Sequence, residues 1–249
     1  MALLWMKTEG DTRYEVRNAG GSLRLYTNGV FHSQFNPKHP VTGSVWDLLL
    51  LPAFFVPAQN IQRVLVLGVG GGAVIRQLEH FLKPEQIVGV ELNPVHLEVA
   101  EKFFGVTDKS VELYQADAAH WIRRYRGGPF DMIIDDLYGE KEGEPVRGVA
   151  ADSKWVRLLI KHLARDGVLV SNFVSSEELR NSAYLSDEKI THRFASAFRF
   201  TTPLYENVVG AFLRTPSSSQ FLREQLKQIP QLDPTRKGSR LRYSIRSLK

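Results

Sequence analysis

The sequence contains no cysteine among its 249 residues. This absence excludes a disulfide framework, a thiolate metal site and a cysteine nucleophile. Long hydrophobic runs are also missing. The longest apolar stretch, 45–56, is interrupted by Asp47 and Pro52, whereas a membrane helix needs about 20 apolar residues. Charged residues begin too close to the start of the sequence for a typical signal peptide. We therefore predict a soluble, cytoplasmic protein with no membrane partner.

Two catalytic signatures are absent as well. No Tyr-x-x-x-Lys pair supports a short-chain nicotinamide dehydrogenase, although 68–73 satisfies G-x-G-x-x-A. The seven histidines form no His-Glu-x-x-His motif, so metal-dependent hydrolysis has no candidate site and we predict no metal. Hydride transfer and metal hydrolysis are thus the weaker hypotheses.

Acidic residues are absent from the last part of the chain. The segment 235–249 carries six basic residues and no acid, while the whole chain has a formal charge of +5. Such a tail can contact a polyanion. However, Leu241, Tyr243 and Ile245 alternate with polar residues, which is typical of a half-exposed strand. We therefore consider nucleic-acid binding unlikely.

The pattern along the chain predicts an α/β fold in three segments. Residues 1–43 contain a small β-meander whose Asn28-Gly29 suits a tight hairpin, and 216–249 contains a helix and the basic strand or tail. Between them, 44–215 alternates short apolar strands with helices, which indicates a mostly parallel, Rossmann-like sheet. A capping box of Ser44 and Asp47 is expected to open the first helix. The last helix of this segment is expected from about residue 186 to Phe198.

A glycine-rich turn follows the first strand of the predicted sheet. Glycines here let the backbone approach a ligand, and the helix that follows offers free N–H groups and a partial positive charge. The turn can therefore hold a carboxylate or phosphate, although this motif alone is weak. The candidate ligand-binding glycines are Gly68, Gly70, Gly71 and Gly72.

Acidic residues end the next two strands. Glu91 can accept hydrogen bonds from a ribose diol. Asp117 can accept one from an adenine amino group, or it can simply cap the helix that begins at Ala118. Ligands of open α/β sheets bind beyond the carboxyl ends of the strands, so we predict that Glu91, Leu92, Asp117 and Ala118 contact a nucleoside cofactor.

The fourth strand ends in the acid pair Asp135-Asp136. Both are predicted at the same crevice, with Asp135 among the cofactor-binding residues and Asp136 as the catalytic residue that orients or deprotonates an acceptor. Turn formation is the alternative role for these acids. The loop 138–147 carries Glu140, Glu142 and Glu144. This loop is expected either to cover the site, where its acids would suit a cationic amine acceptor, or to be a solvated surface loop.

Taken in order, these motifs resemble the spermidine synthase-like branch of class I methyltransferases. The likeness covers roughly residues 14–213 and includes TNGVF, LLPAF, LGVGGGAVIRQL, VGVELNP, YQADAAHWI and FDMIIDD. It implies a seven-stranded sheet with a reversed last strand, an adenosyl-sulfonium cofactor and often a homodimer.

The sequence also departs from aminopropyltransferases of this family. Gly71 stands where they carry the Asp of GGGDGG, Gly139 replaces the second acid of Asp-Ser-Ser-Asp-Pro, and 45–48 replaces Tyr-His-Glu-Met. Gly71 is expected to leave room for a methionine carboxylate. The sequence therefore predicts a methyltransferase that uses S-adenosylmethionine, acting on a small-molecule, polyamine or protein acceptor. The alternatives are an aminopropyltransferase that uses decarboxylated S-adenosylmethionine, and a non-catalytic cofactor-binding module.

Overall fold

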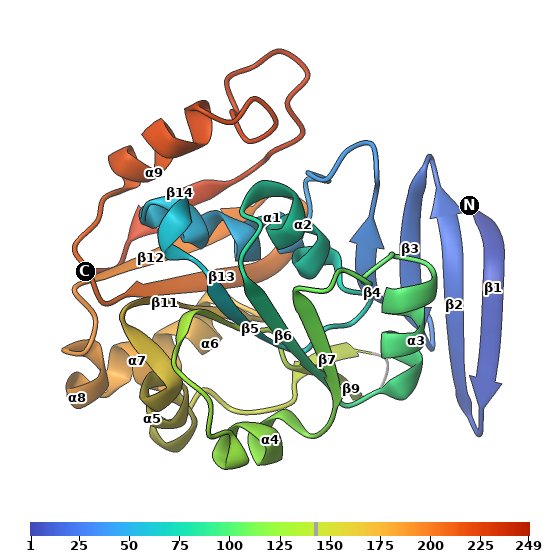
Figure 1. The fold of residues 1–249 in the computed structure, drawn as a ribbon, viewed down its shortest axis with the longest axis horizontal. Helices are drawn as coiled ribbons and strands as arrows, with labels where there is room; N and C mark the ends of the chain where they lie inside the picture. Colours follow the sequence, from blue (N-terminus) through green and yellow to red (C-terminus); the bar gives the residue numbers. More distant parts are fainter. Residues whose placement is uncertain (142–143) are drawn as a thin grey trace.

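The computed structural model describes residues 1–141 and 144–249. It begins with an antiparallel four-stranded sheet, which lies at one side of the molecule with the N-terminus on its outer strand (Figure 1). Asn28 and Gly29 both have positive φ and connect the last two strands, as the hairpin prediction requires. The first of these strands, Ala2–Glu9, was not predicted from the sequence. The sheet comprises β1 (Ala2–Glu9), β2 (Thr12–Ala19), β3 (Ser22–Thr27) and β4 (Val30–Phe35).

The main sheet of the described chain has eight strands in the order β14-β12-β13-β11-β8-β5-β6-β7. Strands β11, β8, β5, β6 and β7 run parallel, whereas β13 runs antiparallel to β11. This confirms the predicted Rossmann-like architecture with its reversed last strand, to which β14 adds an outer strand. The strands are β5 (Arg63–Leu67), β6 (Gln86–Glu91), β7 (Val111–Gln115), β8 (Phe130–Asp135), β11 (Leu163–Phe173), β12 (Ser196–Thr202), β13 (Tyr205–Leu213) and β14 (Ser244–Ser247).

Helices cover both faces of this sheet, because alternate residues of its central strands are buried on opposite sides. In β5, for example, Val64 and Val66 pack into one core, and Leu65 and Leu67 into the other. The first core is covered by α1 (Val45–Leu50), the 3-10 helix η1 (Leu51–Phe55), α2 (Ala73–Phe81), α3 (Pro94–Lys102) and α9 (Ser219–Lys227). The second is covered by α4 (Ala118–Arg124), α5 (Ser153–His162), α6 (Ser176–Asn181), α7 (Ala183–Ser186) and α8 (Glu188–Thr191).

Two local predictions need correction. The helix expected up to Phe198 is wrong, because α8 ends at Thr191 and β12 begins at Ser196. Phe198 and Phe200 face the core from β12 while its backbone pairs with β13 and β14, so sheet pairing overrides the local helical pattern. The expected capping box is incomplete: Ser44 is the N-cap of α1, but its hydroxyl makes no capping bond and bonds to Thr42 instead, while the carboxylate of Asp47 accepts from the backbone N–H groups of Thr42 and Gly43.

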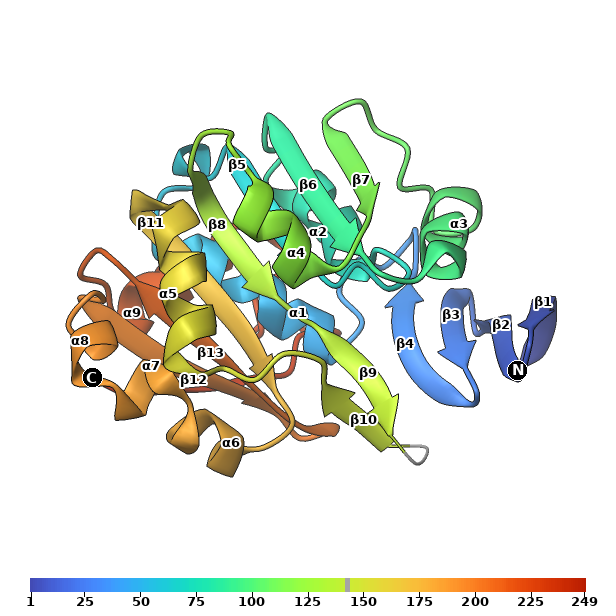
Figure 2. The ribbon, with the colours of Figure 1, turned by 90° about the horizontal axis from the view of Figure 1, so that it is seen from below.

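A hairpin projects from the end of β8 toward the N-terminal sheet (Figure 2). It consists of β9 (Tyr138–Lys141) and β10 (Glu144–Arg147), and its base is fixed by Arg147. Within the described part of the chain, no helix is both long and apolar enough to span a bilayer. The predicted loop acids Glu140, Glu142 and Glu144 lie outside the side chains that the structure describes.

Candidate active site

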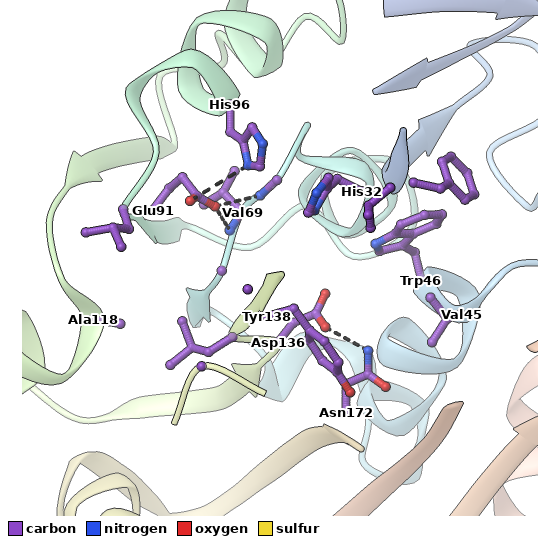
Figure 3. Close-up of a pocket in the computed structure, with 18 of the residues that line it drawn as sticks. His32, Val45, Trp46, Val69, Glu91, His96, Ala118, Asp136, Tyr138 and Asn172 are labelled. Atoms are coloured by element: carbon purple, nitrogen blue, oxygen red, sulfur yellow. Dashed lines mark hydrogen bonds and ion pairs between the residues drawn. The ribbon is translucent and has the colours of Figure 1, made fainter. Parts of the chain in front are cut away.

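A cavity of about 710 Å³ lies beyond the carboxyl ends of β5, β6 and β8, and the N-terminal sheet closes one side of it. The structure brings most of the predicted site residues to this cavity (Figure 3). Those that line it are Gly68, Gly70, Glu91, Leu92, Asp117, Ala118 and Asp136. Gly71, Gly72 and Asp135 are not among the lining residues.

The glycine turn is tightly enclosed by backbone on two sides. Gly68 has a φ of +88°, and a Cβ atom there would lie 2.1 Å from the carbonyl oxygen of Asp136. At Gly70 a Cβ atom would lie 3.1 Å from the carbonyl oxygen of His32. Only glycine fits the first position, because any side chain would separate the turn from the end of β8. The close approach is what places Asp136 beside the turn.

Gly71 does not line the cavity, and the expected room beside it is filled. A Cβ atom at Gly71 would lie 2.7 Å from Cε2 of Phe104 and 2.9 Å from Cβ of Ser33. The space expected there for a methionine carboxylate is therefore filled by these two side chains.

Glu91 holds the glycine turn in place. Its Oε2 accepts from the N–H groups of Val69, at 3.0 Å, and Gly70, at 2.9 Å, and its Oε1 accepts from the N–H of Asn93. The carboxylate thus occupies the turn donors that an anionic ligand would need. Glu91 still lines the cavity, so its binding of a ribose stays a prediction.

Asp117 caps α4, as the alternative interpretation proposed. Its Oδ1 accepts from the N–H of His120 at 2.6 Å, which satisfies one free donor of the helix start. The same residue also lines the cavity beside Ala118. Capping and contact with a ligand are therefore compatible.

The adjacent acids Asp135 and Asp136 have different environments. Asp135 is fully buried, and its Oδ2 accepts from Arg147 at 2.6 Å, from the indole of Trp155 at 3.0 Å and from Ser171 at 3.4 Å. These partners tie the hairpin base to α5 and β11. The structure therefore places Asp135 in the protein interior and away from the predicted cofactor.

Asp136 faces the cavity, where its Oδ1 accepts from Nδ2 of Asn172 at 2.8 Å (Figure 3). Burial raises its pKa to about 6, and the Asn172 hydrogen bond partly opposes this rise. A carboxylate with this pKa is mostly ionised at neutral pH, yet it is more basic than an ordinary Asp. It can therefore accept a proton from a bound acceptor.

The sequence analysis missed several cavity residues. His96 is one of them: its Nε2 lies 2.8 Å from the Thr27 hydroxyl, and burial lowers its pKa to about 4, so the ring is neutral at physiological pH. Asn172 is the second-last residue of β11 and lies at the same sheet edge, so the rule that located Glu91 would also have found it. The other missed residues come from segments far apart in the chain and include His32, Trp46, Tyr205 and Asn207, whereas Tyr138 begins the loop that was expected to cover the site.

Comparison with known proteins gives a consistent result. The model of the spermine/spermidine synthase domain matches residues 47–219. Polyamine aminopropyltransferase 2 of Caldanaerobacter subterraneus subsp. tengcongensis is 35% identical over 106 residues, covering 41% of this chain and 35% of that protein. Polyamine aminopropyltransferase of Clostridium beijerinckii is 30% identical over 145 residues, covering 54% and 49%.

Among solved structures, a probable spermidine synthase from Corynebacterium glutamicum superposes with a TM-score of 0.73 at 16% identity, covering 99% of this chain and 91% of that one. At this identity the match supports the fold alone. The chain spans about a third to half of the length of the two curated relatives.

These comparisons overturn the predicted activity. The sequence relatives are named polyamine aminopropyltransferases, and the matching domain model is that of spermine and spermidine synthases. The prediction of a methyltransferase that uses S-adenosylmethionine is therefore wrong, and the aminopropyltransferase alternative fits better. The prediction depended partly on the room supposed at Gly71, which Phe104 and Ser33 fill.

Proposed function

Because the chain belongs to the spermine/spermidine synthase domain family, we propose that it transfers an aminopropyl group from decarboxylated S-adenosylmethionine to an amine. One observation carries the proposal: a single cavity joins the glycine turn, Glu91 and Asp117 to the basic carboxylate of Asp136. In this arrangement Glu91 and Asp117 would hold the ribose and the adenine, and Asp136 would face the acceptor.

The charge of the cavity supports the decarboxylated donor. Its described lining includes three carboxylates, on Glu91, Asp117 and Asp136, and no Lys or Arg. The carboxylate of S-adenosylmethionine would therefore meet no cation there, and Glu91 already occupies the N–H groups of Val69 and Gly70. An aminopropyl chain instead brings an ammonium group, which these acids attract.

In this reaction the bonds form and break between the two substrates, and the protein forms no covalent intermediate. The acceptor nitrogen attacks the aminopropyl carbon bound to the sulfonium, the carbon–sulfur bond breaks, and its electron pair stays on sulfur as a neutral thioether. The proton lost by the new ammonium passes to Asp136. Sulfonium is a good leaving group, so orientation of the two substrates is the main contribution, which can supply about 7–11 kcal/mol.

Incubation of the purified protein with each donor and a panel of amines tests the proposal. We expect methylthioadenosine from decarboxylated S-adenosylmethionine, detected by mass spectrometry together with the alkylated amine. Asp136→Asn should lose this activity, whereas Asp166→Asn, an exposed aspartate outside the cavity, should keep it. Formation of S-adenosylhomocysteine from S-adenosylmethionine, with no turnover of the decarboxylated donor, would refute the proposal.

A further inference from the structure

The cavity has an aromatic end that the donor contacts proposed above do not use. Phe31, Trp46, Tyr138 and Tyr205 line it, and the Phe31 and Trp46 rings meet edge to face at 5.2 Å. Figure 3 shows Trp46, Tyr138 and Asn172 on one side, away from Glu91 and Ala118. Of the three carboxylates in the described lining, Asp136 is the one that lies next to this end, where it hydrogen-bonds to Asn172.

The positively charged side chain of Arg24 lies against Phe31, one of the residues of this aromatic end. The guanidinium of Arg24 sits 5.4 Å from the centre of the Phe31 ring, and its Nε donates to Gln34 at 2.7 Å. Within the described part of the chain, no carboxylate lies within ion-pair distance of Arg24. Burial raises the pKa of Tyr205, and the charge of Arg24 partly opposes the rise, so Arg24 is also within electrostatic reach of Tyr205.

The buried acid Asp47 is also within electrostatic reach of Tyr205, where its charge raises the pKa that the charge of Arg24 lowers. Its carboxylate is 1% exposed and accepts from Thr42, Gly43 and Gln77. Burial raises its pKa to about 6, so part of its charge is lost already in mildly acidic solution. Asp47 is therefore held by these donors and does not line the cavity, so Asp136 is the one carboxylate of the described lining that an ammonium group in the aromatic end could reach.

Gly139 lies at the edge of this aromatic end and adds no acid to it. It lines the cavity next to Tyr138, and a Cβ atom built on it meets no heavy atom within 4 Å. A side chain would fit at this position. The replacement of the second acid of Asp-Ser-Ser-Asp-Pro by Gly139 therefore leaves open space that no residue of the described chain fills.

From these observations we propose that the acceptor is an amine with one ammonium group and an apolar tail, and that Arg24 and Gly139 disfavour diamines. This inference rests on the proposed aminopropyl transfer and specifies its acceptor. The reacting nitrogen lies at Asp136, and the tail packs against Phe31, Trp46 and Tyr205. A diamine of the same length places its second ammonium near Arg24, where no further carboxylate of the described lining is left to pair with it.

The test compares n-butylamine with 1,4-diaminobutane as acceptors for decarboxylated S-adenosylmethionine. We expect kcat/KM to be about tenfold or more higher for the monoamine. Arg24→Gln and Gly139→Asp should each raise the ratio of diamine to monoamine kcat/KM by about fivefold or more. Arg242→Gln, an exposed arginine of the tail, should leave the ratio unchanged. An equal or higher kcat/KM for the diamine with the unaltered protein would overturn the inference.

A binding measurement separates this inference from the proposed function. Calorimetric titration of both amines into the protein saturated with methylthioadenosine needs no turnover. Tighter binding of n-butylamine supports the acceptor inference even if no amine is alkylated, in which case only the proposed function fails. Turnover with tighter binding of the diamine would retain the proposed function and reject the monoamine acceptor.

Discussion

The two ends of the cavity use their carboxylates differently. At the ends of β6 and β7, Glu91 and Asp117 accept hydrogen bonds from backbone N–H groups of the glycine turn and of α4. At the end of β8, Asp136 accepts one bond from the side chain of Asn172 and has a raised pKa. Backbone bonds fix the position of an acid, whereas burial with one amide partner raises the pKa of Asp136 and leaves it able to exchange a proton. The first end is therefore suited to holding a ligand and the second to chemistry.

Asp136→Asn should have the largest effect. Removal of a general base typically lowers kcat by about 10²–10⁴-fold, and asparagine keeps the size of the side chain. Asp117→Asn should instead raise the KM for the donor with little change in kcat. Initial rates of methylthioadenosine release measure both. Equal losses of kcat in the two variants would contradict the distinction between the two ends.

Asp135→Ala should act on stability. The variant removes the 2.6 Å ion pair of the buried Arg147 cation, whose side chain is only 4% exposed, and leaves Glu178 at 3.7 Å as its remaining ion-pair partner. Breaking a buried pair in this way costs about 3–5 kcal/mol, which urea unfolding would detect. If the variant unfolds like the parent but loses donor binding, Asp135 belongs to the site as the sequence predicted.

The two glycines that replace family acids should respond differently to alanine. Gly71→Ala forces a Cβ atom to 2.7 Å from Phe104, and overpacking of this kind costs about 1–3 kcal/mol. Gly139→Ala meets open space and should change the free energy of unfolding by less than about 0.5 kcal/mol. Thermal unfolding of both variants checks the pair. Equal shifts would show that Phe104 and Ser33 move aside easily.

The sequence was sufficient for the parallel part of the main sheet and for one end of the cavity. Strands followed by Gly68, Glu91 and Asp136 mark the carboxyl edge of a parallel sheet, and the position of that edge follows from topology alone. The direction in which a side chain points does not. Asp135 and Asp136 are adjacent in the chain, but only the packing of Arg147 and Trp155 shows which one is buried.

The aromatic end of the cavity lies beyond such reasoning. Phe31, Trp46 and Tyr205 come from the N-terminal sheet, α1 and β13, and no local pattern indicates that these segments meet. The missed strand β12 has the same cause, because its pairing with β13 and β14 depends on residues distant in sequence. Likewise, only the structure shows that the Phe104 ring fills the space beside Gly71. A glycine in the sequence therefore does not by itself indicate free space.

The smallest predicted effect concerns the hydrogen bond between Asn172 and Asp136. Asp136 must be deprotonated to accept a proton, so kcat/KM should rise with pH through about 6, the pKa of this carboxyl. The Asn172 bond favours the ionised form and lowers the pKa. Asn172→Leu should therefore move the rising limb to higher pH and slow the reaction at pH 6 by about three- to tenfold. Asn207→Leu, which removes a donor to Asn172 at 3.2 Å but no contact to Asp136, should shift the limb less. A pH–rate profile that is unchanged in Asn172→Leu would show that another group sets this limb and that Asp136 is not the base.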